Sequence, residues 1–150
     1  GMKGDELLTL SSGGLMHDLG KGLVPQDILN KPARLEEAEF EIMKTHVDHT
    51  KAIFGKANDI TIGVEIIALQ HHEKLDGSGY PLGLKGSELN ILARMGSIVD
   101  IYSALTDRRV YKPAMDPDKA LGIMSEMSDG LDMGLLNTFK EYLKDATSNP

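Results

Sequence analysis

The chain has 150 residues, 41% of them hydrophobic, which is enough to bury the core of one ordinary globular domain. It contains no cysteine, so disulfides, thiolate zinc sites and cysteine nucleophiles are excluded, and any metal would be held by nitrogen and oxygen ligands. The net charge of -7 argues against a broad electrostatic grip on DNA or RNA, although a local basic pocket could still hold one small phosphate ligand.

The chain also lacks the sequence signals of secretion and membrane insertion. Its N-terminus does not show the pattern of a signal peptide, and no apolar run is long enough to span a membrane, so we expect a cytoplasmic protein without membrane contact. Gly1 before Met2 indicates a residue left by an expression tag. Because no repeat or low-complexity linker interrupts residues 1–150, a single domain is expected, with a frayed tail at 147–150.

Apolar residues recur at spacings of three and four along the chain, and alternation with period two is nearly absent, so the sequence predicts an all-α fold. The first helix is expected over residues 5–19 and ends at a loop rich in glycine. A helical turn over 25–30 and an amphipathic helix over 35–54 follow.

The second half of the chain continues this pattern. Further helices are expected, in chain order, over residues 60–72, 87–106, 117–127 and from 132 onward. Asp116 before Pro117 is a favourable helix start, because an aspartate caps the first turn and proline suits the first helical position. The segment 73–86 is an irregular, glycine-rich loop.

Several ionisable residues fall on the apolar faces of these helices. His46 lies beside Val47 within the apolar stripe of its helix, and His71 follows Ile67 by four positions. Asp100 falls on the apolar face of the helix after the loop. A carboxylate that points into a core needs a partner, because burying an unpaired charge is costly.

A single buried histidine that bonds to the backbone is common, so each histidine taken alone is more simply a core residue. The set differs, because three inward-facing histidine positions, Asp100 and the pair His17-Asp18 are expected to converge with few lysines or arginines to pair them. Coordination of metal would satisfy all of these groups together. Imidazole and carboxylate suit zinc, iron or manganese, and a set of this size can hold more than one ion.

These residues, in this order, resemble the HD-GYP domain, a branch of the HD phosphohydrolase superfamily known for hydrolysing the bacterial messenger cyclic di-GMP. The segments that carry the resemblance are HDLGK at 17–21, His46, HHEKLDGSGYP at 71–81, Asp100 and ALT at 104–106. The resemblance runs from about residue 15 to 115. It implies an all-helical HD-type bundle with two or three metal ions, often iron or manganese, beneath a pocket for the cyclic dinucleotide. Zinc, nickel and magnesium are alternative metals.

The resemblance also implies roles for individual residues. The residues that match metal ligands are His17, Asp18, His46, His71, His72 and Asp100. Asp18 matches the bridge between ions and Lys21 a lysine near the metals and the substrate phosphate, so these two are the expected catalytic residues. The residues that match substrate contacts are Gly79, Tyr80, Pro81, Arg109 and Lys112. His49 is left outside the ligand set.

The chain departs from the family pattern at several positions. Family members carry a further glutamate and histidine ligand on a helix upstream of the HD pair, and none of the sixteen residues before His17 is a histidine here. Ser103 stands where the family usually has an aspartate, Val110 replaces a proline and Ala33 a glycine. We therefore expect a domain without the family's N-terminal helix, in which the apolar face of residues 7–16 is uncovered and drives homo-oligomer formation.

Three functions are open at this point. The leading hypothesis is a metal-dependent phosphodiesterase that hydrolyses cyclic di-GMP through a metal-activated water. One alternative is a truncated or degenerate module that binds nucleotide, or a signalling-protein partner through the GYP loop, without turnover; another is a phosphohydrolase of a different nucleotide. Simpler roles also exist for single residues, since Arg109 and Lys112 could form a solvated helix end and Tyr80 could anchor a tight turn.

Overall fold

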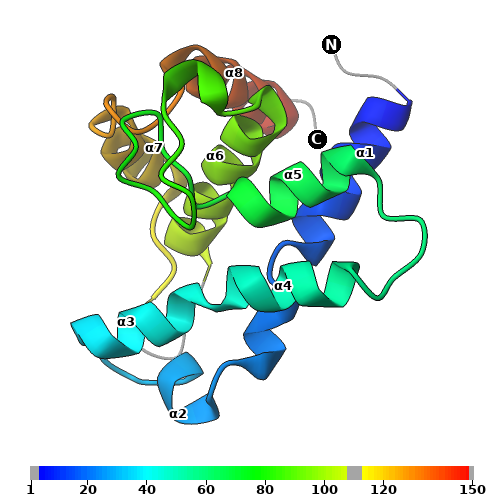
Figure 1. The fold of residues 1–150 in the computed structure, drawn as a ribbon. Coiled ribbons are helices and arrows are strands. Elements are labelled where there is room, and N and C mark those ends of the chain that lie inside the picture. Colours follow the sequence, from blue (N-terminus) through cyan, green and yellow to red (C-terminus); the bar gives the residue numbers. More distant parts are fainter. Residues whose placement is uncertain (1–3, 108–112, 149–150) are drawn as a thin grey trace.

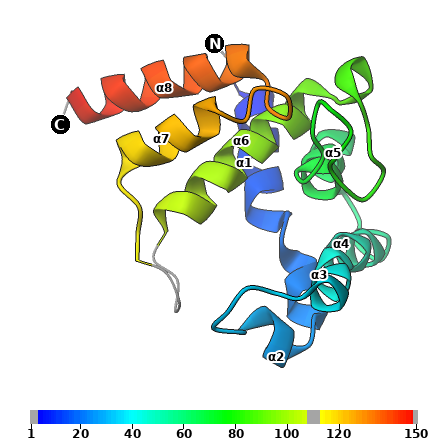
Figure 2. The same cartoon turned by 90° about the vertical axis from the view of Figure 1, so that its left-hand side faces the viewer.

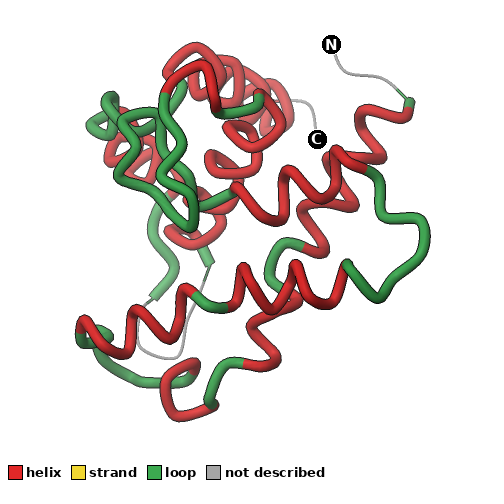
Figure 3. The backbone as a smooth tube through the Cα atoms, viewed as in Figure 1, coloured by secondary structure: helices red, strands yellow, loops and turns green. Residues whose placement is uncertain are grey.

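The computed structural model describes residues 4–107 and 113–148, and these fold into helices joined by loops (Figures 1 and 3). The prediction of an all-α fold is confirmed. Within the described residues, β structure is limited to an isolated bridge between Asp76 and Lys85. Arg109, Val110 and Lys112, which the sequence singled out, lie outside the described residues.

The α-helices are, in chain order, α1 (Asp5–Met16), α2 (Gln26–Leu29), α3 (Glu37–Lys44), α4 (His46–Phe54), α5 (Ile62–Gln70), α6 (Ile91–Thr106), α7 (Pro117–Ser125) and α8 (Met133–Ser148). Two 3₁₀ turns, η1 (Leu19–Leu23) and η2 (Gly86–Glu88), lie between them. No helix in the described part of the chain has both the length and the apolar character needed to cross a bilayer.

The helices form two packed groups that meet at α6. α1 and α4 pack on α5, which in turn contacts α6 (Figure 1). α7 and α8 pack on α6 at the other end of the molecule, away from α2 and α3 (Figure 2). The buried apolar residues divide in the same way, into a cluster of Phe54, Val64 and Ala68 and a cluster of Ile98, Leu121, Met124, Leu131 and Leu136. These two cores fix the helices that carry the polar cluster described below.

The predicted helix over 35–54 is wrong in one respect, because the structure divides it at Thr45 into α3 and α4. The Thr45 amide bonds to the Ile42 carbonyl at 3.1 Å, three residues back, and the Thr45 hydroxyl donates to the same oxygen at 2.6 Å. A threonine hydroxyl that competes for a helix carbonyl tightens the turn. The break begins a new helix at His46.

Two helices begin later than predicted, because polar side chains cap their first turns. Thr61 accepts a bond from the Val64 amide and Asn90 from the Leu92 amide, so α5 and α6 begin later than expected. The first helix, α1, ends earlier than predicted, at Met16 rather than at residue 19.

The last two helices also differ from their predicted limits. α7 ends at Ser125, two residues before the predicted end at 127. α8 continues through Ser148 and so includes the first two residues of the tail that is predicted to fray. Residues 149 and 150 lie outside the described residues.

A close backbone approach at Gly20 joins η1 to α4. The Gly20 amide donates to the Thr50 hydroxyl at 2.9 Å, and that hydroxyl donates to the His46 carbonyl at 2.9 Å. A Cβ atom at position 20 would lie 1.9 Å from the same carbonyl oxygen. Only glycine therefore lets the chain after the His17-Asp18 pair lie against α4, and the Thr50 hydroxyl fixes it there.

The substitution Gly20→Ala is expected to destabilise the protein by about 2–3 kcal/mol, because the added methyl group overlaps a backbone oxygen that cannot move without shifting α4. Urea unfolding followed by circular dichroism measures the change. Gly22→Ala is the matched control, since a Cβ there meets nothing within 4 Å. Equal stability of the two variants would contradict the close packing of η1 on α4.

Candidate metal centre

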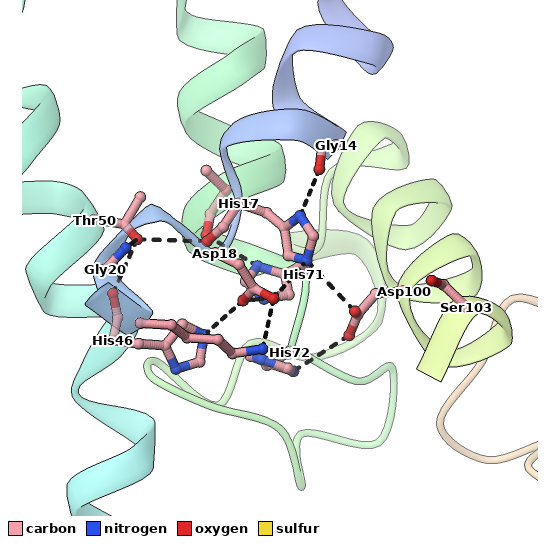
Figure 4. Close-up of polar contacts among 12 residues, drawn as sticks. Gly14, His17, Asp18, Gly20, His46, Thr50, His71, His72, Asp100 and Ser103 are labelled. Atoms are coloured by element: carbon pink, nitrogen blue, oxygen red, sulfur yellow. Dashed lines mark hydrogen bonds and ion pairs between the residues drawn. The ribbon is translucent and has the colours of Figure 1, made fainter. Parts of the chain in front are cut away.

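The six side chains that the sequence predicts as metal ligands lie together where four helices meet (Figure 4). His17 and Asp18 follow α1, His46 opens α4, His71 and His72 follow α5, and Asp100 lies within α6. They form two groups. In each group every residue contributes one potential ligand atom, a ring nitrogen or a carboxylate oxygen, and these atoms all lie within 4.8 Å of one another. One group is Asp18, His46, His71 and His72, and the other is His17, Asp18 and Asp100.

Asp18 belongs to both groups because its two oxygens face different neighbours. Oδ1 lies 3.5 Å from Nε2 of His46 and 3.9 Å from Nε2 of His71. Oδ2 lies 3.2 Å from Nε2 of His17 on the other side. A carboxylate placed in this way can contact two cations at once, one through each oxygen.

Asp100 closes the other side of the cluster. Its Oδ1 lies 3.5 Å from Nε2 of His17 and its Oδ2 3.9 Å from Nδ1 of His72. The described groups that surround the two carboxylates are therefore mainly imidazoles, which are good metal ligands when neutral.

Backbone hydrogen bonds orient three of the histidine rings. Nδ1 of His17, His46 and His71 each lies at hydrogen-bond distance from the carbonyl oxygen three residues earlier, at 2.6, 2.8 and 2.9 Å respectively. A ring that donates from Nδ1 to a carbonyl has its Nε2 available to a metal, and such outer contacts fix the ring that ligates. In all three rings Nε2 points towards Asp18.

The atoms that face the centre lack hydrogen-bond partners among the described residues. They are Nε2 of His17, His46, His71 and His72, together with Oδ1 of Asp18, and all are buried. The ion-pair contacts around Asp18 do not have hydrogen-bond geometry at these atoms. Leaving a buried polar atom unpaired costs about 1–3 kcal/mol, and one or two divalent cations would give all five a partner. The donor set therefore fits a metal centre.

The electrostatics of the protein groups prepare most of the cluster for a cation. Burial lowers the pKa of His71 to about 4 and that of His72 to about 3, and it lowers the pKa of His46 as well. These rings are neutral at pH 7, which is the form that ligates a metal. Although burial alone would raise it, the pKa of Asp18 is lowered by the neighbouring His17 ring and Lys21 ammonium, so its carboxylate is ionised.

His17 behaves differently from the other histidines. Burial acts to lower its pKa, but the carboxylates of Asp100 and Asp18 outweigh burial and raise the pKa to about 10. Without a competing cation, a proton on His17 balances the two carboxylates. A metal ion bound in the group of His17, Asp18 and Asp100 would displace this proton.

Lys21 lies next to Asp18, as the resemblance implied. Its Nζ is 2.5 Å from Oδ2 of Asp18, and its side chain is 30% exposed. The lysine thus contacts the shared carboxylate and is still partly exposed to solvent. From that position, it can face a bound anion.

The loop that contains Gly79, Tyr80 and Pro81, called the GYP loop here, lies directly against the ligand cluster. The Tyr80 ring stacks on the His72 ring, with centroids 4.6 Å apart and planes at 24°, and lies 6.5 Å from the His46 ring. Burial, together with the nearby carboxylates of Asp100 and Asp18, raises the pKa of Tyr80, so the phenol keeps its proton at neutral pH. Tyr80 can therefore donate a hydrogen bond.

Gly79 is required for this position of the tyrosine. A Cβ at Gly79 would lie 2.5 Å from each of three backbone atoms, Glu73 Cα, the His72 oxygen and the Lys74 nitrogen. The Tyr80 amide donates to the His72 carbonyl at 3.2 Å, and the following Tyr80-Pro81 peptide bond is cis. The GYP tripeptide thus packs against the backbone that carries the two adjacent histidines.

Glu73 has a positioning role that the sequence analysis did not assign. Its side chain is fully buried, and its carboxylate accepts bonds from the amides of Leu82 at 2.6 Å and Leu84 at 2.9 Å. These bonds hold the far end of the GYP loop. One feature of the sequence could have indicated this role, because Glu73 directly follows His71 and His72, two predicted metal ligands.

A cleft of about 320 Å³ opens beside the cluster, between α1, α5 and α6. His17, Asp100 and Ser103 line it on the polar side, and Leu10 and Val99 are among its apolar lining. Ser103, where the family usually has an aspartate, donates to Asp107 at 2.8 Å and belongs to neither ligand group.

Comparison with known proteins agrees with this geometry. A family model described as "HD domain" matches residues 1–135. The chain belongs to the HD domain family. The HD family is metal-dependent, and the two side-chain groups around Asp18 are the candidate sites for metal in this HD domain.

Curated relatives place the chain near the HD-GYP branch, which confirms the predicted resemblance. It is 36% identical over 126 residues to a cyclic di-GMP phosphodiesterase of Pseudomonas aeruginosa, a match that covers 84% of this chain and 30% of that protein. It is 43% identical over 112 residues to 3'3'-cGAMP-specific phosphodiesterase 3 of Vibrio cholerae, covering 75% and 24% respectively. A cyclic di-GMP phosphodiesterase of Thermotoga maritima is 40% identical over 118 residues, covering 77% and 32%. This HD domain therefore spans about a quarter to a third of the length of these relatives.

The substitution Glu73→Gln is expected to destabilise the HD domain by about 1–3 kcal/mol, because the charge that accepts two backbone amides is lost and an amide NH₂ faces one of them. Urea unfolding measures the stability, and hydrogen exchange at the Leu82 and Leu84 amides should become faster. Glu141→Gln on the exposed side of α8 serves as control. The role of Glu73 is refuted if its variant is as stable as this control.

Proposed function

We propose that residues 1–150 form one domain that acts as a metal-dependent phosphodiesterase and hydrolyses cyclic di-GMP through a metal-activated water. The observation that carries the proposal is the pair of ligand groups that share Asp18, with their inward-facing atoms unpaired by the described protein groups. The names of the curated relatives support a cyclic dinucleotide as the class of substrate.

Two ions would be held in this proposal. His46, His71 and His72 would hold one ion, and His17 and Asp100 the other, with Asp18 shared between them. The resemblance to the HD-GYP domain favours iron or manganese, and the mixed imidazole and carboxylate set without thiolate is compatible with either. Zinc, nickel and magnesium are the alternatives that metal analysis would separate. Bound there, the cations would lower the pKa of a water molecule and neutralise the charge that develops on the phosphoryl oxygens.

The side chains around the ligands would bind and orient the substrate. Lys21 keeps the shared carboxylate in place and offers a partly exposed positive charge beside the cluster, which would contact a phosphate oxygen. Tyr80 offers a phenol donor, with Gly79 and Pro81 shaping the loop that carries it. Arg109 and Lys112 remain proposed phosphate contacts and lie outside the described residues.

A second substrate is favoured by one specific observation. Three relatives named as specific for 3'3'-cGAMP match at 43%, 36% and 41% identity, which is the same range as the 36% to 43% of the relatives named for cyclic di-GMP. Both molecules contain guanine and a cyclic phosphodiester ring. Comparing kcat/KM for the two substrates in one assay decides between them.

Hydrolysis of cyclic di-GMP by the protein loaded with manganese or iron(II) is the direct test. Chromatography should show release of the linear dinucleotide or GMP. The variants His71→Ala and Asp18→Ala are each expected to lower kcat/KM by about 10³-fold or more, because residues that act together as one centre fail together. Metal analysis should find two ions per chain before substitution and fewer in either variant.

The matched control for this experiment is His49→Ala. His49 lies on the same helix as His46, but its Nε2 is 3.4 Å from the Thr45 hydroxyl, and it belongs to neither ligand group. Its activity should stay within about twofold of the unaltered protein. A protein that binds two ions yet yields no product above the Asp18→Ala background would reject the phosphodiesterase and favour binding without turnover.

We propose in addition that copies of the chain associate through α1. Leu7, Leu8 and Leu15 on this helix are 49%, 66% and 83% exposed, and such apolar surface favours association. Sedimentation equilibrium should therefore find a dimer or a larger oligomer. A monomer at high micromolar concentration contradicts this expectation.

A further inference from the structure

An aromatic and cationic wall stands beside the candidate metal centre, formed by Phe40 and Lys44 of α3 and Tyr80 of the GYP loop. The rings of Phe40 and Tyr80 meet edge to face, with centroids 6.0 Å apart and planes at 86°. Lys44 Nζ lies 5.5 Å from the centre of the Phe40 ring and 5.7 Å from that of Tyr80. All three residues are outside the two ligand groups.

The position of Lys44 differs from that of a lysine extended into solvent. Its side chain is only 27% exposed, and Nζ pairs with Glu41 at 2.7 Å while lying over the two rings. Contacts of a cation with aromatic faces hold a flexible side chain in place. The charge of Lys44 is thus kept beside Tyr80.

Phe40 leaves aromatic surface open at the same place. The residue is 44% exposed, although its ring contacts Tyr80 and Lys44. A partly exposed phenyl ring beside a site for a nucleotide offers a flat surface on which a base can stack.

The wall also lies at a suitable reach from the ligand cluster. Tyr80 is stacked on His72 at 4.6 Å, and Phe40 is the next ring outward at 6.0 Å from Tyr80. Phe40 is therefore linked to the metal ligand His72 through a single intervening ring, that of Tyr80. A nucleotide whose phosphate lies at the centre carries its base over a similar span.

We propose that Phe40 and Lys44 form a nucleobase subsite, in which Phe40 stacks a guanine of the substrate and Lys44 donates to its acceptor edge. Guanine presents O6 and N7 as acceptors, whereas adenine presents an N6 donor in place of O6, so the lysine selects guanine. The subsite rests on the proposed function, because it takes the phosphate to be held at the metal centre. It adds a determinant of base specificity on a helix that contributes none of the ligands.

The test compares binding of two probes to the metal-loaded protein by calorimetry. One probe is the phosphorothioate analogue of cyclic di-GMP, which resists hydrolysis, and the other is the same ring with 1-deoxyribose in place of both guanosines. Phe40→Leu and Lys44→Met should each weaken binding of the first probe about tenfold and that of the base-free probe less than about twofold. Lys44→Met should also reduce the preference for the first probe over its adenine counterpart.

Matched controls separate this role from a general effect on stability. Tyr142→Leu removes an exposed aromatic ring on α8, and Lys51→Met removes an exposed lysine on α4. Both controls should bind the two probes as the unaltered protein does. In turnover, the Phe40 and Lys44 variants should raise KM for cyclic di-GMP and leave kcat unchanged.

The possible outcomes are distinct. If the two substitutions weaken binding of both probes equally, Phe40 and Lys44 only contact each other along α3 and support Tyr80. This result overturns the subsite. Unchanged binding of the first probe overturns it as well. If the unaltered protein binds both probes but does not hydrolyse cyclic di-GMP, the phosphodiesterase proposal fails and the binding comparison still decides the subsite. If it binds neither probe, both proposals fail.

Discussion

The shared carboxylate of Asp18 is the interaction on which the rest of the structure depends. Its oxygens face His46 and His71 on one side and His17 on the other, and the Nε2 atoms of these three rings have no hydrogen-bond partner among the described residues. Burying such groups without a partner is costly. The four helices around Asp18 therefore have to be placed so that a cation can satisfy them.

Two devices achieve that placement. The first is a hydrogen bond to the backbone near a helix end. In three of the histidine rings Nδ1 contacts the carbonyl oxygen three residues earlier, so that Nε2 faces the centre. The second is close backbone contact at Gly20 and Gly79, where a side chain would overlap with neighbouring main chain. Both place polar side chains by means of the backbone, which is more rigid than side-chain packing alone.

Sequence reasoning succeeded where a residue type and its spacing carry the information. The apolar spacing predicted an all-α fold, and the inward positions of His46, His71 and Asp100 predicted their convergence. It failed where a local hydrogen bond competes with the helix, as at Thr45, because periodicity does not register one tightened turn. It also gave no role to Glu73, whose partners are backbone amides that are invisible in a pattern of side chains.

The sequence by itself determined the chemistry available to this protein: a helical HD domain without thiolates, with imidazoles and carboxylates in a recognisable order. Only the tertiary structure decided how that chemistry is arranged. It turned the two oxygens of Asp18 towards different ligand groups, and it brought Phe40 and Lys44 of α3 against Tyr80, about forty positions away along the chain. The physical reason is that spacing along the chain fixes which face of a helix a residue occupies, whereas contacts between helices depend on packing and on the close approaches that two glycines allow.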